Sequence, residues 1–283
     1  MLDRSCGRGT TVAFVQVDSA HVVVTGGAAG IGAAAARAFA GAGARGVVVA
    51  DVDGDGAAAV AAEIGGLGVA VDLGSEEGVA ALVERAEAEY GPVDLFCSNA
   101  GIAGPYGGPE VADEDWARTW NVNVMAHVWA ARILLPRMLE RRHGHLSSTA
   151  SAAGLLANPG LMPYSVTKHA ALTVAEWLAI TYGGNGSGVS FSCFCPQGVA
   201  TPMLETWRRE DPSSRLASAS GDTISPDQAA QALLAGIEDD RFLILSHAEV
   251  QTYMQRKAAD PERWLGGMQR FQAQIDAARA EAG

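Results

Sequence analysis

Two residues suited to proton transfer stand four positions apart, Tyr164 and Lys168, just after Pro163. Proline favours the first turn of a helix, and a spacing of four places both side chains on one helix face. A free phenol has a pKa near 10 and is a poor base at neutral pH. A lysine ammonium ~4 Å away, at an effective dielectric of about 20, would favour the phenolate by roughly 4 kcal/mol, or about three pK units. The pair predicts a general acid–base near physiological pH; taken alone, it also fits a solvated helix face.

A glycine-rich turn could hold a phosphate. Residues 21–25 (HVVVT) are typical of a buried strand, and residues 31–42 of an alanine-rich helix. Gly26 and Gly30 lie between these two elements, and Gly32 lies at the start of the helix. Gly26 permits a tight turn, Gly30 lets the backbone approach a pyrophosphate, and Gly32 lets the helix pack on the sheet. The phosphate would then lie on free N–H groups at the helix N-terminus. A plain turn is the alternative in a chain with 34 glycines.

Two aspartates follow the next two expected strands. Asp51 ends the run 46–50, and Asp72 ends the run 68–71. A carboxylate at position 51 can accept hydrogen bonds from the adenosine ribose and would repel a 2′-phosphate, and Val52 adds no positive charge. We therefore predict NAD rather than NADP, with Asp72 as an acceptor for the adenine amino group. Helix caps are the alternative for both aspartates.

These residues need a framework, and short β-branched runs alternate with helical stretches along the chain. Strands are expected at 21–25, 46–50, 68–71, 93–98, 145–149, 189–195 and 241–245. Helices are expected at 31–42, 55–64, 75–90, 113–142 and 163–182, and from residue 249 onward, with the fourth broken by Pro136. The alternation predicts right-handed βαβ units and an α/β, doubly wound Rossmann fold, with a central parallel sheet of about seven strands flanked by helices on both faces.

The domain organisation is expected to be simple. Residues 1–20 form an N-terminal extension in which 11–17 could add an edge strand, and residues 21–283 form a single dinucleotide-binding catalytic domain. A substrate lid is expected at about 202–224. The apolar residues of this lid would be Met203, Leu204 and Trp207. The helical stripe of Trp264, Leu265, Met268 and Phe271 favours core or subunit packing over substrate contact.

Composition excludes several classes of function. With 20 basic and 32 acidic residues the net charge is −12, which argues against nucleic acid and against an anionic membrane surface as partners. Apolar runs are too short to span a bilayer. Four cysteines are too few for a disulfide scaffold, so the reducing cytoplasm is expected. No metal site is predicted, because the closest histidine pair, His143 and His145, fits a structural role at the surface.

Taken together, these motifs resemble the single-domain short-chain dehydrogenase/reductase family. They run in family order over roughly residues 21–203: the turn 25–32 (TGGAAGIG), Asp51, Asp72, the Ser-Asn-Ala-Gly run 98–101, Asn123, Ser151, Tyr164 with Lys168, and the segment 196–201. The segment 196–201 departs from the family in having Gln197 between its proline and glycine, which puts the local loop shape in doubt.

The resemblance implies roles for individual residues. Tyr164 would be the general acid–base, Ser151 would hold the substrate oxygen, Lys168 would hold the nicotinamide ribose and lower the tyrosine pKa, and Asn123 would hold a water linking Lys168 to solvent. The cofactor would contact Gly26, Ala29, Gly30, Ile31, Asp51, Val52, Asp72, Leu73, Asn99, Ala100, Gly101, Tyr164, Lys168, Val199 and Thr201.

The resulting expectation is an NAD-dependent oxidoreductase that interconverts a secondary alcohol and a ketone by hydride transfer. The substrate would be a medium-sized, largely apolar secondary alcohol or ketone, and the oxidation of alcohol to ketone would be the working direction. The family resemblance also implies a homodimer or homotetramer built through helices 113–142 and 163–182 and the edge of the sheet. The alternatives are an NADPH-dependent 3-oxoacyl reductase, which would need basic cofactor and docking surfaces, and a non-catalytic dinucleotide-binding protein.

Overall fold

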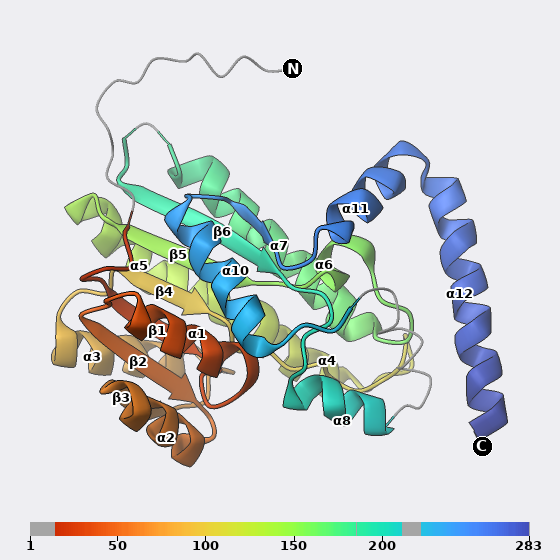
Figure 1. Ribbon diagram of the computed structural model, residues 1–283, viewed down its shortest axis with the longest axis horizontal. Coiled ribbons are helices and arrows are strands. Elements are labelled where there is room, and N and C mark those ends of the chain that lie inside the picture. Colours follow the sequence, from red (N-terminus) through yellow and green to blue (C-terminus); the bar gives the residue numbers. More distant parts are fainter. Residues whose placement is uncertain (1–14, 185, 211–221, 283) are drawn as a thin grey trace.

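A parallel sheet of seven strands forms the centre of the molecule in the computed structural model, which describes residues 15–184, 186–210 and 222–282 (Figure 1). The strands are β1 (His21–Thr25), β2 (Gly46–Asp51), β3 (Leu67–Ala70), β4 (Leu95–Ser98), β5 (Gly144–Thr149), β6 (Val189–Cys195) and β7 (Leu243–Leu245). Their order across the sheet is β3-β2-β1-β4-β5-β6-β7, and every neighbouring pair is parallel. The predicted fold class is confirmed.

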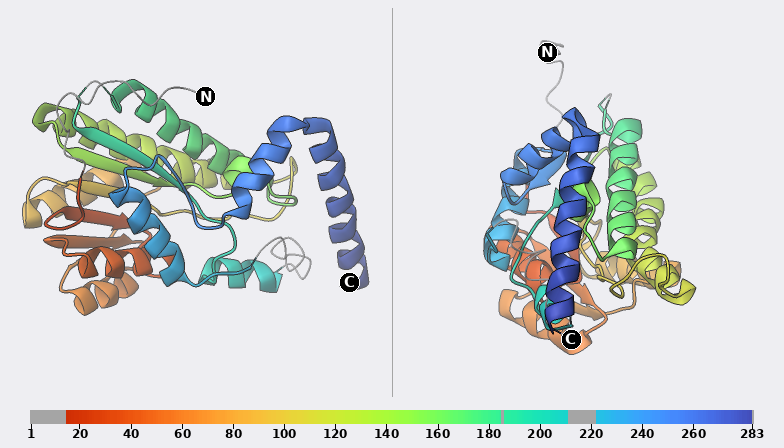
Figure 2. Two further views of the ribbon diagram at one scale, coloured as in Figure 1. Left: turned by 45° about the horizontal axis from the view of Figure 1, so that its top comes forward. Right: turned by 90° about the vertical axis from the view of Figure 1, so that its right-hand side faces the viewer.

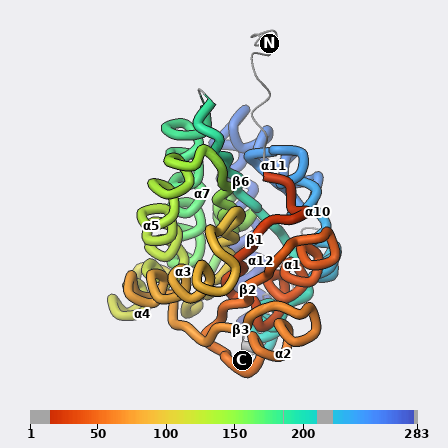
Figure 3. Tube along the Cα trace, turned by 90° about the vertical axis from the view of Figure 1, so that its left-hand side faces the viewer, coloured from red at the N-terminus to blue at the C-terminus, as the bar shows by residue number. Residues whose placement is uncertain are grey.

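Helices cover both faces of the sheet (Figure 3). Those up to the fifth strand are α1 (Gly30–Gly41), α2 (Gly54–Ile64), α3 (Glu76–Tyr90), α4 (Asp113–Trp120), the π-helix η1 (Asn121–Met125) and α5 (Ala126–Arg141). Those beyond it are α6 (Ala153–Leu156), α7 (Met162–Tyr182), α8 (Pro202–Glu210), α10 (Pro226–Glu238), α11 (Glu249–Ala259) and α12 (Pro261–Ala282).

The alternation of side chains along the strands produces two apolar cores. Val22 and Val24 of β1 point to the side covered by α1, α2 and α10, whereas Val23 between them packs with α3 and α5. Each of these three valines is fully buried. Because both faces are covered, the strands are continuous apolar runs rather than alternating ones, as parallel sheets require.

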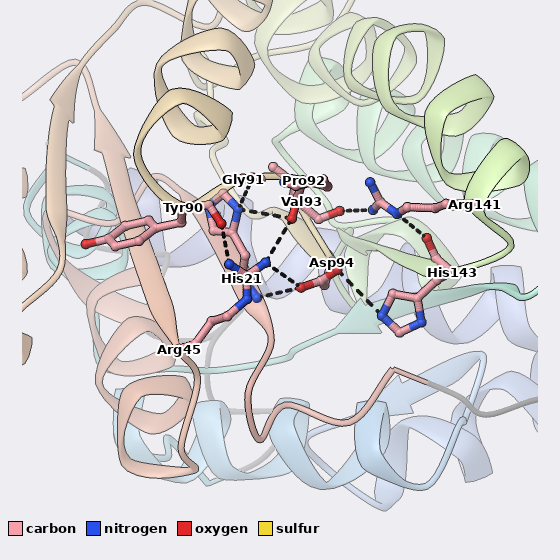
Figure 4. Close-up of polar contacts among 9 residues, drawn as sticks. All are labelled: His21, Arg45, Tyr90, Gly91, Pro92, Val93, Asp94, Arg141 and His143. Atoms are coloured by element: carbon pink, nitrogen blue, oxygen red, sulfur yellow. Dashed lines mark hydrogen bonds and ion pairs between the residues drawn. The ribbon is translucent and has the colours of Figure 1, made fainter.

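Polar side chains tie together the amino-terminal ends of the strands, the edge opposite the glycine-rich turn (Figure 4). The Asp94 carboxylate accepts a hydrogen bond of 2.8 Å from the His21 backbone N–H and one of 3.2 Å from Arg45. His143 Nε2 lies 3.5 Å from the other carboxylate oxygen, and His21 Nδ1 bonds to the Gly91 carbonyl at 2.8 Å. This cluster fixes the start of β1 beside β4 and has a structural role.

The sequence interpretation of the histidine pair was wrong for one member. His143 is about half exposed, but His145 is buried, with its two ring nitrogens 2.8 Å from the hydroxyls of Ser190 and Ser192 on β6. Among the described residues, no group of three or more His, Cys, Asp or Glu side chains could hold a metal ion.

The helix expected over 113–142 breaks at a different place from the one predicted. α5 continues through Pro136, and the irregularity is the π-helix at residues 121–125 between α4 and α5. The N-terminal residues 1–14, including most of the possible edge strand at 11–17, lie outside the described residues, as do residues 211–221 of the expected lid.

The C-terminal helices extend the molecule to one side. α11 leads to α12, which stands away from the sheet (Figures 1 and 2). No helix in the described part of the chain has the length and apolar character needed to cross a membrane.

Candidate active site

A cavity of about 800 Å³ lies at the carboxyl ends of the strands, where β1 and β4 are neighbours in the sheet. The connections from β1 and β4 leave toward opposite faces at this point, and ligands of open α/β sheets bind there. All but one of the predicted cofactor residues line this cavity: Gly26, Ala29, Gly30, Ile31, Asp51, Val52, Asp72, Leu73, Asn99, Ala100, Gly101, Tyr164, Lys168 and Thr201. The exception, Val199, lines a neighbouring cavity.

The glycine-rich turn has the backbone geometry that its residues predict. Gly26 and Gly30 have φ angles of +65° and +55°, a region that disfavours other residues. A Cβ on Gly32 would lie 2.0 Å from the Gly26 carbonyl oxygen, so only glycine allows α1 to begin this close to the end of β1. The turn therefore leaves the backbone open toward the cavity, which fits a bound pyrophosphate.

The Asp51 carboxylate is fixed at the edge of this cavity. It accepts hydrogen bonds of 3.0 Å from the backbone N–H groups of Ala28, in the glycine-rich turn, and of Asp53. The cap of α2 is Asp53, whose side chain accepts from the Gly56 N–H. The helix-cap alternative for Asp51 was therefore wrong.

Asp72 is also not a helix cap. Its carboxylate accepts a 2.9 Å hydrogen bond from the Gly74 N–H, and Ser75 is the residue that caps α3. Both aspartates thus line the cavity with carboxylates that are oriented by backbone donors. Carboxylates at these positions fit a nucleoside with free hydroxyl and amino donors.

The proton-transfer residues converge beside this cavity. Tyr164 lies in the first turn of α7, and its hydroxyl is hydrogen-bonded to that of Ser151, which follows β5. Lys168, one turn further along α7, is buried and donates a 2.9 Å hydrogen bond to the Thr149 carbonyl. Its Nζ is 5.8 Å from the centre of the Tyr164 ring.

The expected depression of the tyrosine pKa is not found. Burial raises the pKa of Tyr164 above its ordinary value, and the hydrogen bond from Ser151 opposes this without reversing it. Burial also lowers the pKa of Lys168 to about 8. The pKa expected for Tyr164 from the sequence assumed an ammonium ~4 Å from the phenol and left out the desolvation of both groups.

Asn123 lies in the π-helix and is fully buried. Its side chain accepts from the Ile102 N–H at 2.9 Å and donates to the Ile102 carbonyl at 2.9 Å and to the Thr167 hydroxyl at 3.1 Å. A Cβ on Gly101 would lie 3.0 Å from Lys168 Nζ and 3.2 Å from Asn123 Oδ1, so both side chains pack on this glycine. π-Helices of this kind are frequent at functional sites. The water-holding role of Asn123 stays a prediction.

The segment 196–201 keeps an ordered shape despite Gln197. Ile224 pairs with it, donating to the Gly198 carbonyl and accepting from the Ala200 N–H. Thr201 accepts from the Leu204 N–H at 3.3 Å, at the start of α8, and its methyl group lies against Gly30. The glutamine therefore does not disrupt the loop that closes the cavity over the glycine-rich turn.

A second cavity, of about 430 Å³, adjoins the first. Tyr164, Ile31, Pro196, Thr201 and Met203 line both, and Ser151 lines only the second. Its other walls are predominantly apolar, and they include the three members of the expected lid, Met203, Leu204 and Trp207. A substrate in this cavity would present its reacting carbon at the junction, beside Ser151 and Tyr164.

Sequence reasoning missed several cavity residues. Arg118 of α4, with Asn121 and Val122, lines the larger cavity, and Tyr253 and Arg256 of α11 line the smaller one. The core packing expected of the C-terminal stripe is not found: Trp264, Met268 and Phe271 line the smaller cavity, while Leu265 is 58% exposed, and the alternative of subunit packing stays a prediction. Their helical spacing was the available signal, but it does not say what the apolar face contacts.

Comparison with known proteins agrees with this geometry. The family model described as short chain dehydrogenase matches residues 20–212. The chain is 38% identical to 1-deoxy-11-beta-hydroxypentalenate dehydrogenase of Streptomyces exfoliatus, over 84% of this chain and 86% of that protein. It is 30% identical to 17-beta-hydroxysteroid dehydrogenase 13 of Homo sapiens, over 75% of this chain and 70% of that protein.

A solved structure is similar over most of the chain. A short chain dehydrogenase/reductase from Burkholderia phymatum in complex with NAD superposes with a TM-score of 0.79 at 28% identity, covering 88% of this chain and 96% of the other. The chain belongs to the short-chain dehydrogenase/reductase family. Within that family it is an oxidoreductase that interconverts a secondary alcohol and a ketone with a nicotinamide dinucleotide.

Proposed function

We propose that the enzyme oxidises an apolar alicyclic secondary alcohol to its ketone with NAD, using Tyr164 as the general base. The observation that carries the proposal is the convergence of Ser151 and Tyr164 at the junction of the two cavities, with Lys168 one helix turn away. With NAD bound, the larger cavity would hold the nicotinamide, which would supply the hydride acceptor for the carbinol carbon. The alcohol lies in the smaller cavity.

In this proposed reaction, side chains of the protein bind the substrate oxygen and transfer the alcohol proton. The Ser151 hydroxyl donates to the substrate oxygen and holds it against Tyr164, and the Tyr164 oxygen takes the alcohol proton. With a pKa lowered to about 8, Lys168 is still largely protonated at neutral pH, and we propose that its positive charge stabilises the phenolate during proton transfer, against the burial that raises the Tyr164 pKa. In the reverse reaction the Tyr164 hydroxyl returns the proton to the carbonyl oxygen.

NAD rather than NADP is favoured by Asp51. Its carboxylate lines the larger cavity and already accepts two backbone hydrogen bonds, so it is held in place and cannot readily turn away from a 2′-phosphate. The similar Burkholderia phymatum structure contains NAD. A 2′-phosphate would face a like charge near Asp51, and neither 26–32 nor 52–54 contains lysine or arginine.

The choice of substrate follows from the smaller cavity. A volume of about 430 Å³ and mostly apolar walls suit a compact ring system better than a short polar alcohol. The names of two relatives, a hydroxypentalenate and a hydroxysteroid dehydrogenase, agree with an alicyclic alcohol. Neither alternative has better support: the chain keeps Tyr164 and Lys168, unlike a non-catalytic protein, and it lacks lysine and arginine in 26–32 and 52–54, where an NADPH-dependent 3-oxoacyl reductase would need a basic residue.

Replacement of the phenol tests this assignment. We expect Tyr164→Phe to reduce NAD-dependent oxidation of a decalinol and hydroxysteroid panel by ~10²–10⁴-fold, because a general base is lost. NAD binding, measured by calorimetry, should survive because the phenol contributes little to cofactor affinity. Retention of more than about a tenth of the native rate would refute the role of Tyr164.

The remaining parts of the proposal concern the whole protein. We propose one catalytic domain over residues 21–283, a homodimer or homotetramer, and a cytoplasmic location. The buried cysteines Cys97, Cys193 and Cys195 are free thiols, which agrees with a reducing compartment.

A further inference from the structure

The smaller cavity contains one charged side chain among the described residues that line it. That residue is Arg256, and none of the described residues that line these walls is an aspartate or glutamate. The other described lining residues are apolar or uncharged, and the whole chain carries a net charge of −12. A single positive charge among these lining residues, in a protein of net negative charge, favours the binding of an anionic group in this cavity.

Arg256 is held in position by its own helix. The next residue, Lys257, donates a 2.8 Å hydrogen bond to the Leu155 carbonyl and so anchors α11 to α6 beside the cavity. One turn before Arg256, the ring of Tyr253 lies 6.4 Å from that of Trp264, which joins α11 to α12. These contacts fix the backbone from which the arginine side chain extends.

The guanidinium has no acceptor within the part of the chain that the structure describes: no hydrogen bond or ion pair links the Arg256 side chain to another described residue. Arg256 is exposed, and since it also lines the cavity, it lies where the cavity opens to solvent. The nearby Asp260 carboxylate accepts from the Arg263 backbone N–H. The donors of Arg256 are thus available to a group that enters the cavity.

We propose that Arg256 binds a carboxylate on the substrate, so that the enzyme acts on alicyclic hydroxy acids and their keto acids. Arginine presents paired N–H donors that match a carboxylate, and such charge-assisted hydrogen bonds are stronger than neutral ones. The reacting carbinol lies at Ser151 and Tyr164, the apolar walls enclose the rings, and the carboxylate reaches Arg256 at the opening. This inference rests on the proposed function and adds the charge of the substrate.

A panel of hydroxy acids paired with their methyl esters tests the inference. The panel is 4-hydroxycyclohexanecarboxylate, 6-hydroxydecalin-2-carboxylate and 3-hydroxyandrostane-17-carboxylate, which increase the separation of hydroxyl and carboxylate. We measure kcat/KM with NAD for each acid and ester. The native enzyme should prefer at least one acid over its ester by about tenfold, or ~1.4 kcal/mol.

Charge removal should then abolish this preference selectively. In Arg256→Gln the ratio of acid to ester should fall to about one, because the acid loses its cationic partner. Arg256→Lys should keep part of the preference. The matched control is Arg263→Gln, which removes the same charge from a residue that does not line the cavity and should leave the ratio unchanged. A native enzyme that prefers no acid, or a preference that survives in Arg256→Gln, would overturn the inference.

Binding without turnover separates this inference from the proposed function. Trp207 and Trp264 line the cavity, so keto acids and their methyl esters can be titrated by tryptophan fluorescence. Tighter binding of a keto acid than of its ester, lost in Arg256→Gln, would support the carboxylate site even if no alcohol in the panel were oxidised. Equal binding of acid and ester in the native protein would refute it, whatever the rates.

Discussion

At the scale of single side chains, the proposed preference for NAD over NADP depends on Asp51. We expect the native enzyme to favour NAD over NADP by at least about a hundredfold in kcat/KM, or ~2.7 kcal/mol, because a 2′-phosphate would meet a like charge. Asp51→Ala should relax this preference by improving kcat/KM for NADP more than it harms that for NAD. Steady-state kinetics with both cofactors measures the change.

A neighbouring aspartate provides the control for this prediction. Asp53 carries the same charge two residues away but caps α2 and does not line the larger cavity. Asp53→Ala should therefore lower stability by ~1 kcal/mol without altering the preference for NAD. Equal efficiency with NAD and NADP in the native enzyme would show that Asp51 does not face the ribose.

Buried histidines make stability depend on pH. Burial lowers the pKa of His145 to about 4 and that of His127 to about 3, against an ordinary value of 6.5. The unfolded chain therefore binds protons on these rings at a pH where the folded chain does not. Their contribution to stability is complete above pH 6.5 and is lost as the pH falls. By pH 4 the His145 ring alone should cost about 3 kcal/mol of unfolding free energy.

Denaturant unfolding at several pH values checks this expectation. His145→Asn should flatten the decline of unfolding free energy between pH 6.5 and 4, even if it lowers stability at neutral pH. An unchanged slope in His145→Asn would mean that this ring takes up its proton in the folded state.

Residue types and spacings predicted most of the larger cavity but only part of the smaller one. The glycine-rich turn, Asp51 and Asp72 follow strands whose ends meet at one edge, so their positions were implied once the strands were recognised. Arg118 and Arg256 come from helices without a local motif, and their approach to the cavities depends on tertiary packing. Desolvation of Tyr164 likewise depends on what covers it, which spacing does not reveal.

At the scale of elements, most strands and helices were predicted to within two residues, because each carries its own periodic pattern. α10 was missed although its sequence contains a start signal: Ser225 and Gln228 form a capping box, and Pro226 occupies the first turn. The π-helix between α4 and α5 could not be predicted, since one extra residue in a turn leaves no distinct pattern of apolar residues.

Near its C-terminal end, α12 contacts the loop that follows β4. The Arg279 guanidinium lies 4.0 Å from the centre of the Tyr106 ring, and the Tyr106 hydroxyl packs against Gly160, where no Cβ would fit. Three other residues of α12, Trp264, Met268 and Phe271, line the smaller cavity. This contact therefore holds one wall of the cavity in place.

We expect Arg279→Ala to loosen that wall. Loss of the cation–π contact should cost about 0.5–1 kcal/mol locally, raise KM for apolar alcohols severalfold and leave kcat nearly unchanged. Amide hydrogen exchange along α12 should become faster. Arg270→Ala, on the same helix but outside the cavity, and Tyr106→Phe, which keeps the ring, should both resemble the native enzyme. Unchanged exchange in Arg279→Ala would show that the contact does not hold the helix.

At the scale of the whole molecule, topology followed from the order of elements. A βαβ chain with right-handed crossovers can bury apolar strands only between two helical layers, and the two apolar cores are the result. The C-terminal helices were predicted as helices but not as walls of the smaller cavity. Their placement depends on single contacts such as those of Lys257 and Arg279, which no periodic pattern encodes.

The outer surface of α7 carries an apolar stripe that could mediate self-association. Val166, Trp177 and Ile180 are 40%, 58% and 84% exposed, and their spacing places them on one face of the helix. α4 and α5 lie on the same side of the sheet as α7, and Trp120 of α4 is 39% exposed (Figure 3). Exposed apolar patches of this kind mark protein interfaces in many folded proteins.

We therefore expect a dimer or tetramer at micromolar concentration, with α7 in the interface. Trp177→Glu should shift the mass measured by light scattering toward the monomer, because a buried unpaired carboxylate is costly at an apolar contact. Leu265→Glu supplies a matched control, since Leu265 is also 58% exposed but lies on α12. A native monomer would refute assembly altogether. If Leu265→Glu dissociates the protein and Trp177→Glu does not, α12 rather than α7 forms the interface.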